Sequence, residues 1–441
     1  MIPNSSTFDQ STVCCLLEHD ALVQRYRQFF ALLDWTALDQ RQASRRVPGP
    51  CPHPQSAYLK AFLIRVCEEK RYMTQLRTFL VEHPLLVIEL GFRLVLDPTH
   101  PYGFDVQRTV PSARWLREQL RRLDPVLLHT LLQTTVTALQ GEIPGLGEIV
   151  AFDVKHIYAW VKENNLRDYV PERYNPERQP AGDPHCKLGV KKSTNQEQPD
   201  GSTKEVKEYL WGYGSGVVAA ITAEYGDVVL AEYTQPFNEN DVSYYRSLYQ
   251  RAVVALGFYP THVTADAAFD AWYVYECAAR HSGIGAVPLN QHGHEEVPRD
   301  HDGVPLCSKG LRMYPTYQFA HSKGFRAQRF RCPLLFPQPT GQRCDHEQFT
   351  KGKGCVKDPN WELGGLMRVL LDRDGPLYHA VYTQRTCCER INSQAQALGI
   401  ERPKVRNQRS VEHLNTLIYV VINVRALQRA KSINRRLLQR E

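Results

Sequence analysis

Three acidic residues have the chemistry and the positions to hold a catalytic metal ion. Asp153 lies inside the apolar run VAFDVKHI, where a carboxylate is costly unless it is paired or binds a cation. Asp266 ends the run HVTAD, and Glu389 lies in the stretch YTQRTCCER. Carboxylates that share one cleft need cations to offset their repulsion, and Mg²⁺ prefers oxygen ligands. Two such ions about 3.5–4 Å apart can activate a nucleophile and stabilise the leaving oxygen in phosphoryl transfer.

Each of these acids also has a local alternative. Asp153 could pair with a neighbouring base, although strand alternation points Lys155 to its own face and His156 to the other. A second aspartate follows Asp266 by four residues, and a second glutamate follows Glu389 further along the chain. These two competitors are Asp270 and Glu401.

The elements that must position the acids form an α/β pattern. Apolar runs and helical spacing from residue 148 onwards predict the order β-β-β-α-β-α-β. The predicted strands are 148–161, 209–225, 227–235, 258–270 and 284–290, and the predicted helices are 243–257 and 272–283. Asp153 then lies on the first strand and Asp266 at the end of the fourth, at the carboxyl edge of the sheet.

Two segments around this core are less regular. Residues 164–208 are polar and predict a long loop, a feature that usually marks a functional or mobile segment. Residues 377–384 predict a strand or a strand leading into a helix, after which the spacing is helical to about 398. A last helix covers 410–440, and its expected buried face carries Val411, Leu414, Ile418, Val421 and Ile422.

The chain before the core reads as helices. Apolar residues recur at three- and four-residue spacing in 22–33, 55–69 and 111–140, and Ser112 is a plausible helix start. The last of these stretches is rich in arginine, namely Arg114, Arg117, Arg121 and Arg122. This region is either a DNA-reading or dimerising module or a plain helical bundle with an exposed basic face.

The strand order and one local motif resemble a known family. The order of elements, with acids on the first strand, after the fourth strand and on a late helix, resembles the ribonuclease-H-like core of DDE transposases of bacterial insertion sequences. One large group of these enzymes carries Tyr-x2-Arg-x3-Glu-x6-Lys around its catalytic glutamate, and Tyr382, Arg385 and Glu389 match that spacing. The lysine position holds Gln396, which is a departure from the pattern.

The resemblance implies a reaction and roles for these residues. Mg²⁺, or Mn²⁺ in its place, would be held by Asp153, Asp266 and Glu389 while DNA is cleaved at the transposon ends and joined to target DNA. Tyr382 and Arg385 would contact DNA. Gln396, at the lysine position of the motif, would contact DNA as an amide donor, and Arg390 and Lys404 are candidates to supply the missing basic contact.

The resemblance also implies an overall organisation. The fold class is α/β, a ribonuclease-H-like mixed sheet with flanking helices, preceded by an all-α domain and interrupted by a Cys-rich insertion. The expected parts are a helical DNA-binding or dimerisation domain (1–147), the first part of the core (148–290), the insertion (291–376), and the rest of the core with a basic tail (377–441). Partners would be double-stranded DNA and a second copy of the chain, in the prokaryotic cytoplasm at the nucleoid.

The insertion between Asp266 and Glu389 contains four spaced cysteines. They are separated by 24, 11 and 10 residues, without a Cys-x2-Cys knuckle, in a polar segment rich in Gly and Pro. Zinc could organise such a segment because little apolar surface is available for burial. The candidate ligands are Cys307, Cys332, Cys344 and Cys355, with His321 and His346 as replacements. The alternative is a set of reduced, partly buried cysteines.

Composition narrows the class of protein. No apolar run approaches the 18 or more residues of a membrane span, and the first ten residues do not have the pattern of a secretory signal. Residues 401–441 hold ten Lys and Arg against three Asp and Glu, so the whole net charge of +7 lies there. A basic end on a neutral body suggests contact with a polyanion or, alternatively, a solvated basic helix. Besides a transposase, a nuclease or resolvase without strand transfer and a non-catalytic DNA-binding protein stay open.

Overall fold

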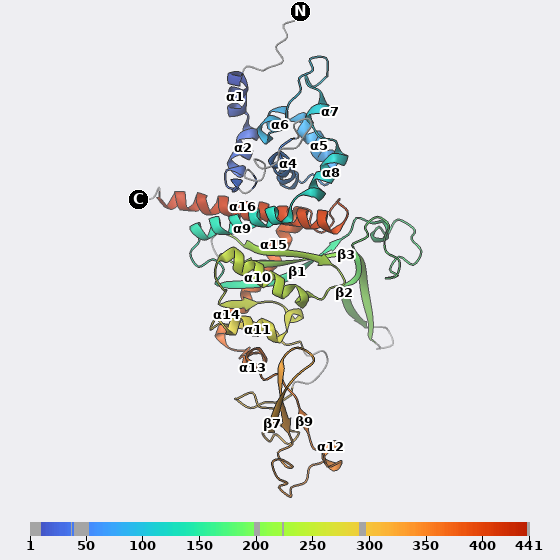
Figure 1. Ribbon diagram of the computed structural model, residues 1–441, viewed down its shortest axis with the longest axis vertical. Helices are drawn as coiled ribbons and strands as arrows, with labels where there is room; N and C mark the ends of the chain where they lie inside the picture. The colour runs from blue at the N-terminus through green and yellow to red at the C-terminus, as the bar shows by residue number, and fades with distance from the viewer. Residues whose placement is uncertain are drawn as a thin grey trace, which may run out of the picture. The chain divides into compact units, whose positions relative to one another are not determined.

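The computed structural model describes residues 10–36, 38, 53–197, 203–222, 225–290 and 297–438, in a mixed α/β fold (Figure 1). The chain forms two compact units. The first unit is Met1–Gly147, Asp153–Gly257 and Cys387–Glu441, and the second is Glu148–Phe152 and Phe258–Thr386. Strand β1 (Ile149–Tyr158) contributes its first residues to the second unit and its remainder to the first.

Helices make up most of the first unit before β1. They are α1 (Gln10–His19), α2 (Ala21–Phe30), α4 (Gln55–Cys67), α5 (Met73–Glu82), α6 (Pro84–Leu90), α7 (Val106–Thr109), α8 (Ala113–Arg122) and α9 (Pro125–Glu142). Ser112 caps α8, as predicted, because its hydroxyl accepts a hydrogen bond from the backbone N–H of Trp115 at 3.2 Å.

The predicted single helix at 111–140 is in fact two helices. Asp124 has an extended backbone, and its carboxylate caps α9 by accepting a hydrogen bond from Val126 N at 2.9 Å. Pro125 occupies the first position of α9, where its missing N–H costs nothing, and it disfavours a helical conformation at the residue before it. The apolar periodicity continues across this break, which is why the sequence pattern alone did not reveal it.

The sheet of the first unit contains four strands, counting the second half of β1. Strands β2 (Lys187–Glu197) and β4 (Val228–Pro236) both pair antiparallel with β3 (Thr203–Ala220), and β3 also neighbours β1. The pairing runs from Lys187 opposite Gly212 for β2, and from Tyr213 opposite Pro236 for β4. Helix α10 (Tyr245–Leu256) packs against β4 and β3.

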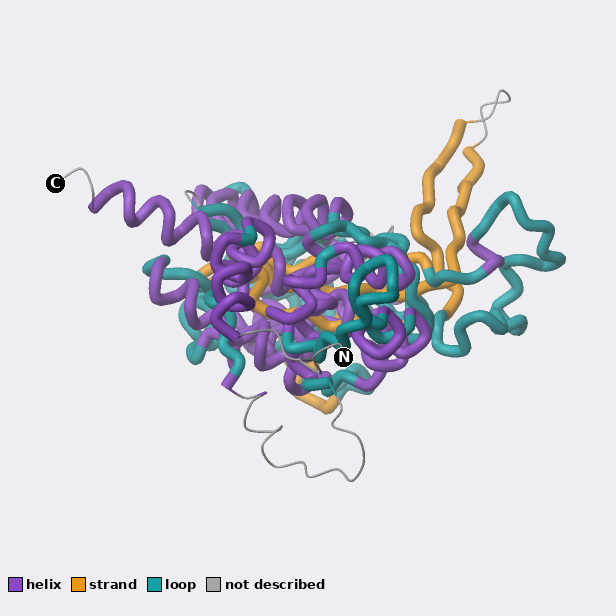
Figure 2. The backbone as a smooth tube through the Cα atoms, turned by 90° about the horizontal axis from the view of Figure 1, so that it is seen from above, coloured by secondary structure: helices purple, strands orange, loops and turns teal. Residues whose placement is uncertain are grey.

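The segment 164–208, predicted as a long loop, is only partly a loop. Its second half forms β2 and the start of β3, an antiparallel hairpin that projects from the rest of the first unit in Figure 2. The prediction was wrong because strand signals come from alternating burial, and this ribbon is exposed: Val190 and Val206 are 43% and 38% accessible.

Helix α16 (Gln408–Leu438) lies at the centre of the first unit's packing. It contacts α9, α4, α8 and β4, and α15 (Thr386–Ala397) precedes it in the chain. All five residues predicted for its buried face are buried, but so are Leu417, Tyr419 and Val420, so this part of the helix is enclosed on all sides. Despite its length, neither α16 nor any other described helix is apolar enough over a sufficient length to cross a membrane.

The second unit combines a small parallel sheet with helices. The first residues of β1 pair in parallel with β5 (His262–Thr264), which pairs in parallel with β6 (Gly285–Ala286). Helices α11 (Trp272–Ala279) and α14 (Pro376–Tyr382) contact these strands. Residues 376–382 are therefore helical, with Pro376 at the first helical position, whereas both predictions for 377–384 began with a strand.

The insertion has more regular structure than its composition predicted. It contains a three-stranded antiparallel sheet in the order β7 (Tyr314–Ala320), β8 (Arg326–Arg331) and β9 (Val356–Lys357). It also contains the helices α12 (Glu347–Thr350) and α13 (Leu363–Leu370). Strand β7 is almost entirely exposed, so it lacks the apolar alternation that would have identified it.

Candidate catalytic pocket and metal-binding clusters

A pocket of about 530 Å³ in the first unit brings Asp153 of β1 and Glu389 of α15 together. These two residues lie far apart in the sequence, so only folding makes them neighbours. The remaining polar and charged residues of the pocket wall are Lys155, His156, Lys191, Asn392, Ser393, Gln396 and Glu401. The pocket wall therefore combines several side chains whose oxygens could bind a metal ion with the ammonium groups of Lys155 and Lys191.

Asn392 holds the Asp153 carboxylate in place. Its amide Nδ2 donates a hydrogen bond to Asp153 Oδ2 at 2.7 Å, while Asn392 itself is only 8% exposed. The other amide atom, Oδ1, is buried without a hydrogen-bond partner among the described residues. Asn392 follows Glu389 by three residues on α15, so the two side chains lie on neighbouring positions of one helix face. Sequence reasoning missed Asn392, although this spacing could have pointed to it.

Lys155 supplies a cation beside Gln396. It lies two residues after Asp153 on β1, and its ammonium Nζ donates to Gln396 Oε1 at 3.1 Å. A lysine ammonium therefore lies next to Gln396, the position at which the motif described above has lysine, but this ammonium comes from strand β1. The alternation of β1 is consistent with Lys155 sharing a face with Asp153.

His156 is not a charged partner for Asp153. Its ring packs edge-on against Phe237, with 4.6 Å between the ring centroids. Burial, together with the positive charges of Lys191 and Lys155, lowers the pKa of His156 to about 4, so the imidazole is neutral at pH 7. The histidine alternative for pairing Asp153 is therefore not supported.

Glu389 and Glu401 both line the pocket, but with different surroundings. Glu389 is exposed in the first turn of α15, whereas the Glu401 carboxylate lies 3.8 Å from the ammonium of Lys191. The backbone carbonyl of Glu401 also accepts a hydrogen bond from Tyr158 N at 2.9 Å, which fixes that segment to the end of β1. Glu401 thus has a charge partner within the pocket.

Two of the predicted DNA contacts in the first unit are engaged in other interactions. Arg390 donates two hydrogen bonds to the buried carboxylate of Asp227, both at 2.7 Å, and these bonds raise the pKa of its guanidinium. The ammonium of Lys404 lies 5.7 Å from the ring centroid of Trp160, and Lys404 is not among the residues lining the Asp153–Glu389 pocket.

Tyr382 and Arg385 belong to the second unit. The Arg385 guanidinium lies 6.0 Å from the ring centroid of Tyr382, and that ring stacks on Tyr378 at 5.5 Å. Tyr382 closes helix α14, and Arg385 lies in the 3-10 turn η4 (Thr383–Arg385) that follows it. The stacked tyrosine rings therefore limit the positions of the Arg385 guanidinium within the second unit.

Asp266 and its competitor Asp270 differ clearly within the second unit. Asp266 follows β5 and caps the 3-10 turn η3 (Ala267–Phe269), accepting a hydrogen bond from Ala268 N at 2.9 Å. Asp270 pairs with Arg368, with Nε–Oδ1 at 2.7 Å, and also accepts from Tyr275 Oη at 2.8 Å. Burial raises the pKa of Asp270, but these hydrogen bonds outweigh it and hold the pKa below its usual value. Asp270 therefore serves the packing of the unit.

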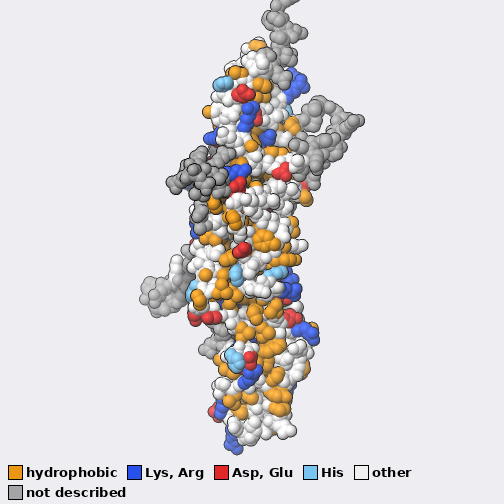
Figure 3. Space-filling view, turned by 90° about the vertical axis from the view of Figure 1, so that its left-hand side faces the viewer, with side chains coloured by type: hydrophobic (Ala, Val, Ile, Leu, Met, Phe, Trp, Pro, Cys, Tyr) orange, Lys and Arg blue, Asp and Glu red, His pale blue; other side chains and the backbone are white. Residues whose placement is uncertain are grey.

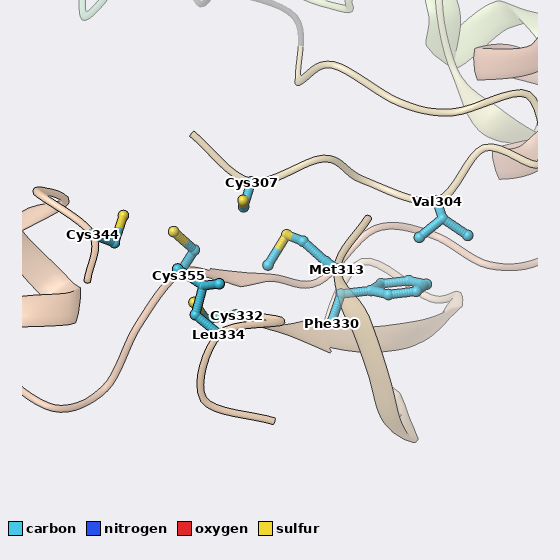
Figure 4. Close-up of a cluster of buried hydrophobic side chains, with 8 residues drawn as sticks. All are labelled: Val304, Cys307, Met313, Phe330, Cys332, Leu334, Cys344 and Cys355. Carbon is cyan, nitrogen blue, oxygen red and sulfur yellow. The ribbon is translucent and has the colours of Figure 1, made fainter. Parts of the chain in front are cut away.

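The four predicted zinc ligands gather in one buried cluster of the second unit. Figure 4 shows them reaching one region from separate segments of the chain. Each is less than 10% exposed, and the cluster also contains Val304, Met313, Phe330 and Leu334. The cysteines are Cys307, Cys332, Cys344 and Cys355.

The four cysteines are buried, and the two histidines proposed as replacement ligands make contacts elsewhere. Burial raises the pKa of the Cys355 thiol, and negative charge on Cys332 and Cys307 would raise it further. The ring of His321 stacks on Phe325 at 4.6 Å, and Nδ1 of His346 caps α12. No three of the four sulfurs lie within 4.8 Å of one another. The sulfurs are therefore spaced more widely than in a closed zinc site.

A third cluster, missed by sequence reasoning, lies in the first unit. Among the described residues, the one group of three such ligand atoms within 4.8 Å is His129, Glu232 and Glu412. Arg251 Nη1 lies 3.2 Å from His129 Nε2 and donates to the Glu232 carbonyl at 2.7 Å. Because a guanidinium stands at the imidazole nitrogen, we interpret the cluster as an ion-pair network. Burial and the nearby Glu232 raise the pKa of Glu412.

Comparison with known proteins gives little additional information. No protein-family profile and no curated protein matches the sequence. Among solved structures, the chain is similar to a piggyBac transposase in a synaptic complex with hairpin DNA, determined by cryo-EM. The TM-score is 0.34 and the identity 11%, over 93% of this chain and 75% of that chain. This likeness does not establish a shared fold.

Proposed function

We propose that the protein is a DDE-type DNA transposase, which cleaves DNA at transposon ends and joins the freed ends to target DNA with the help of divalent cations. The observation that supports this most directly is the shared pocket of Asp153 and Glu389. These were two of the three acids expected from sequence, and they come from a strand and a late helix. The surrounding Tyr-x2-Arg-x3-Glu spacing supports the same class.

We propose Asp266 as the third acid because the resemblance implies an acid directly after the fourth predicted strand. Within the second unit, Asp266 follows Thr264, the last residue of β5, by two positions and precedes the turn η3. The tight hydrogen bonding of Asp270 disfavours the competitor.

The strand pattern is consistent with a ribonuclease-H-like core as part of this proposal. Strand β3 neighbours β1 and pairs antiparallel with β4, while β1, β5 and β6 are consecutive parallel neighbours. In this interpretation, the β2–β3 hairpin extends one strand of the core, and the insertion with β7 to β9 interrupts the chain between the last strand and the helix of Glu389.

The residues of the pocket fit a hard divalent cation. Asp153, Glu389 and the unpartnered buried Oδ1 of Asn392 all offer oxygen, the ligand type that Mg²⁺ and Mn²⁺ take. When bound, such ions would activate the attacking oxygen and stabilise the leaving one. Asn392 would keep the Asp153 carboxylate oriented through their 2.7 Å hydrogen bond.

The basic residues would position the DNA. Lys155, which lies in the pocket wall, would contact a DNA phosphate. Gln396 would hold its ammonium in place through their hydrogen bond. Arg385 and Tyr382 would contact the DNA strand, as the motif implies. Arg390 is a weaker candidate because its guanidinium is already bound to Asp227. We further propose that two copies of the chain pair two DNA ends, which sedimentation of the DNA complex would test.

The structural zinc stays part of the proposal for the second unit. Four cysteines in one buried cluster are the donor set of a closed site. Binding of zinc would then stabilise an insertion whose other packing residues are few.

A cleavage assay with Asp153→Asn tests the catalytic proposal. The native protein is incubated with Mg²⁺ and DNA that carries the terminal repeats flanking its gene. We expect cleaved and joined products from the native protein and none from the variant, with DNA affinity largely unchanged. Retained cleavage by the variant would reject the metal assignment. Nicking without joined products would indicate a nuclease or resolvase, and binding without cleavage by the native protein would indicate a non-catalytic DNA-binding protein.

A further inference from the structure

A second, larger pocket of the first unit is lined mostly by cations. Its volume is about 760 Å³, and it lies between α8 and the segment that leads into α16. Glu118 is the one acidic residue in its lining. The cationic residues are Arg114, Arg117, Arg121, Arg122, Lys404 and Arg406. By contrast, acidic and basic side chains are interspersed on the face of the molecule in Figure 3.

The amphipathic character of α8 explains how these arginines are presented. Leu116 and Leu120 are buried, so the opposite face of the helix is exposed. Arg121 and Arg122 share the carboxylate of Glu118, whereas Arg114 and Arg117 form no ion pair with any described residue. Two of the four arginines thus keep their charge without a partner, at one helical turn from each other.

Aromatic rings support the cations on the other side of the pocket. The Arg406 guanidinium lies 5.0 Å from the ring centroid of Trp160, and Lys404 lies 5.7 Å from the same centroid. On α8, Arg122 lies 5.6 Å from the centroid of Trp115. Stacking against an aromatic face limits the freedom of a long basic side chain, so less entropy is lost when it binds an anion.

Shared residues connect this pocket to the catalytic pocket. A middle pocket of about 320 Å³ has Lys404 in common with the cationic pocket, and Gln396 and Glu401 in common with the Asp153–Glu389 pocket. The exposed or half-buried cations of this middle pocket are Lys70, Arg71, Arg402 and Lys404. The three pockets are therefore adjacent through shared wall residues, and we call them together the basic track.

We propose that the basic track binds the sugar–phosphate backbone of double-stranded DNA and leads it from α8 to the carboxylates. Arg114 and Arg121 are seven residues apart, or about 10 Å along the helix, where one DNA strand carries a charge about every 3.4 Å. A free phosphate would need only a single cluster of cations, whereas a track of several clusters matches a repeating polyanion. This inference rests on the proposed function for its direction towards Asp153, but DNA binding by the track can be measured alone.

The test measures DNA affinity without metal, in full-length Asp153→Asn protein, so that no cleavage occurs. The variant Arg114→Gln/Arg117→Gln is compared with Arg93→Gln/Arg108→Gln, which removes the same charge from exposed residues of the same unit outside all three pockets. The probe is a fluorescent DNA duplex titrated at several salt concentrations. Thermal unfolding of both variants checks that they remain folded.

We expect the track variant to bind roughly tenfold more weakly at low salt, and the slope of log affinity against log salt to fall by about 2. Lys404→Gln, at the junction of two pockets, should reduce that slope by about 1. Equal binding by the track variant and the control would overturn the proposal. So would a polyglutamate competitor that displaces DNA at matched charge, because the track would then be an acidic-protein site. Weaker binding by the track variant, together with cleavage by Asp153→Asn once Mg²⁺ is added, would support the track and contradict only the proposed catalytic roles.

Discussion

The carboxylate pocket of the first unit and the cysteine cluster of the second are opposite kinds of metal-binding candidate. The pocket has oxygen-bearing side chains and contains the exposed Glu389 beside the half-buried Asp153. The cluster is closed and apolar, and each of its four cysteines is less than 10% exposed. An open oxygen site leaves positions for water and phosphate, as phosphoryl transfer requires, whereas a closed sulfur site can only stabilise structure. The difference separates a catalytic proposal from a structural one within a single chain.

Exchanging the acids of the pocket should have the largest effect. Glu389→Gln removes a proposed metal ligand, so we expect DNA cleavage to fall on the order of 10²–10⁴-fold. Glu401→Gln changes an acid of the same pocket that pairs with Lys191, and it should leave most of the activity. Cleavage rates on one DNA substrate compare them. If Glu401→Gln were the more damaging change, Glu401 would be the ligand and the assignment of Glu389 would be wrong.

Removing one cysteine should affect the second unit without affecting the carboxylates. Cys332→Ser is expected to lower bound zinc from about one equivalent per chain to almost none, because a closed site needs all four ligands. Cys277→Ser, a half-buried cysteine of α11 in the same unit, is the matched control and should keep its zinc. Elemental analysis after gel filtration in metal-free buffer gives the answer. Less than half an equivalent in the native protein would leave the cluster as reduced thiols.

Exchanging Lys155 and Gln396 should have a smaller and reversible effect. Lys155→Gln removes the ammonium beside the pocket, and we expect cleavage to fall roughly tenfold, mainly through weaker phosphate contact. Adding Gln396→Lys returns an ammonium to the same place, because the two side chains are 3.1 Å apart in the native protein. The double variant should recover most of the lost rate. No recovery would mean that Lys155 acts only by packing.

The pH dependence of thermal unfolding should show the smallest of these effects, and it concerns a buried histidine of the first unit. Burial lowers the pKa of His413 to about 4, and the imidazole Nδ1 lies 2.7 Å from Leu120 O. The folded state holds this imidazole neutral, so its stabilising contribution is complete above about pH 6.5 and is lost as the pH falls towards 4. The unfolding midpoint of the native first unit should therefore fall in this window.

The variant His413→Gln tests whether His413 causes this loss of stability at low pH. The amide can still donate to the Leu120 carbonyl but does not titrate, so the midpoint of the variant should fall less between pH 6.5 and 4, by on the order of 5 °C. Differential scanning calorimetry at several pH values measures both proteins. Identical pH profiles would show that other groups, such as the buried His156, dominate the acid response.

Local structure could be predicted from the sequence where burial leaves a periodic signal. The cap at Ser112, the strands β1, β3, β4, β5 and β6 in their predicted order and the buried residues of α16 follow from residue type and spacing, and the structure agrees with them. Exposed strands such as β2 and β7 were missed because solvent imposes no alternation on them. The break at Asp124 was missed because a local proline effect interrupts a continuous apolar period.

The sequence by itself determined which groups could do chemistry, because the carboxylates, the thiols and the Tyr-x2-Arg-x3-Glu spacing are fixed by the order of residues in the chain. Only the tertiary structure decided which of them meet. It brought Glu389 to Asp153, supplied Asn392 and Lys155 as neighbours, and tied Arg390 to Asp227. The physical reason is that these contacts join residues far apart in the chain, and their geometry depends on how α15 packs beside β1 rather than on local spacing.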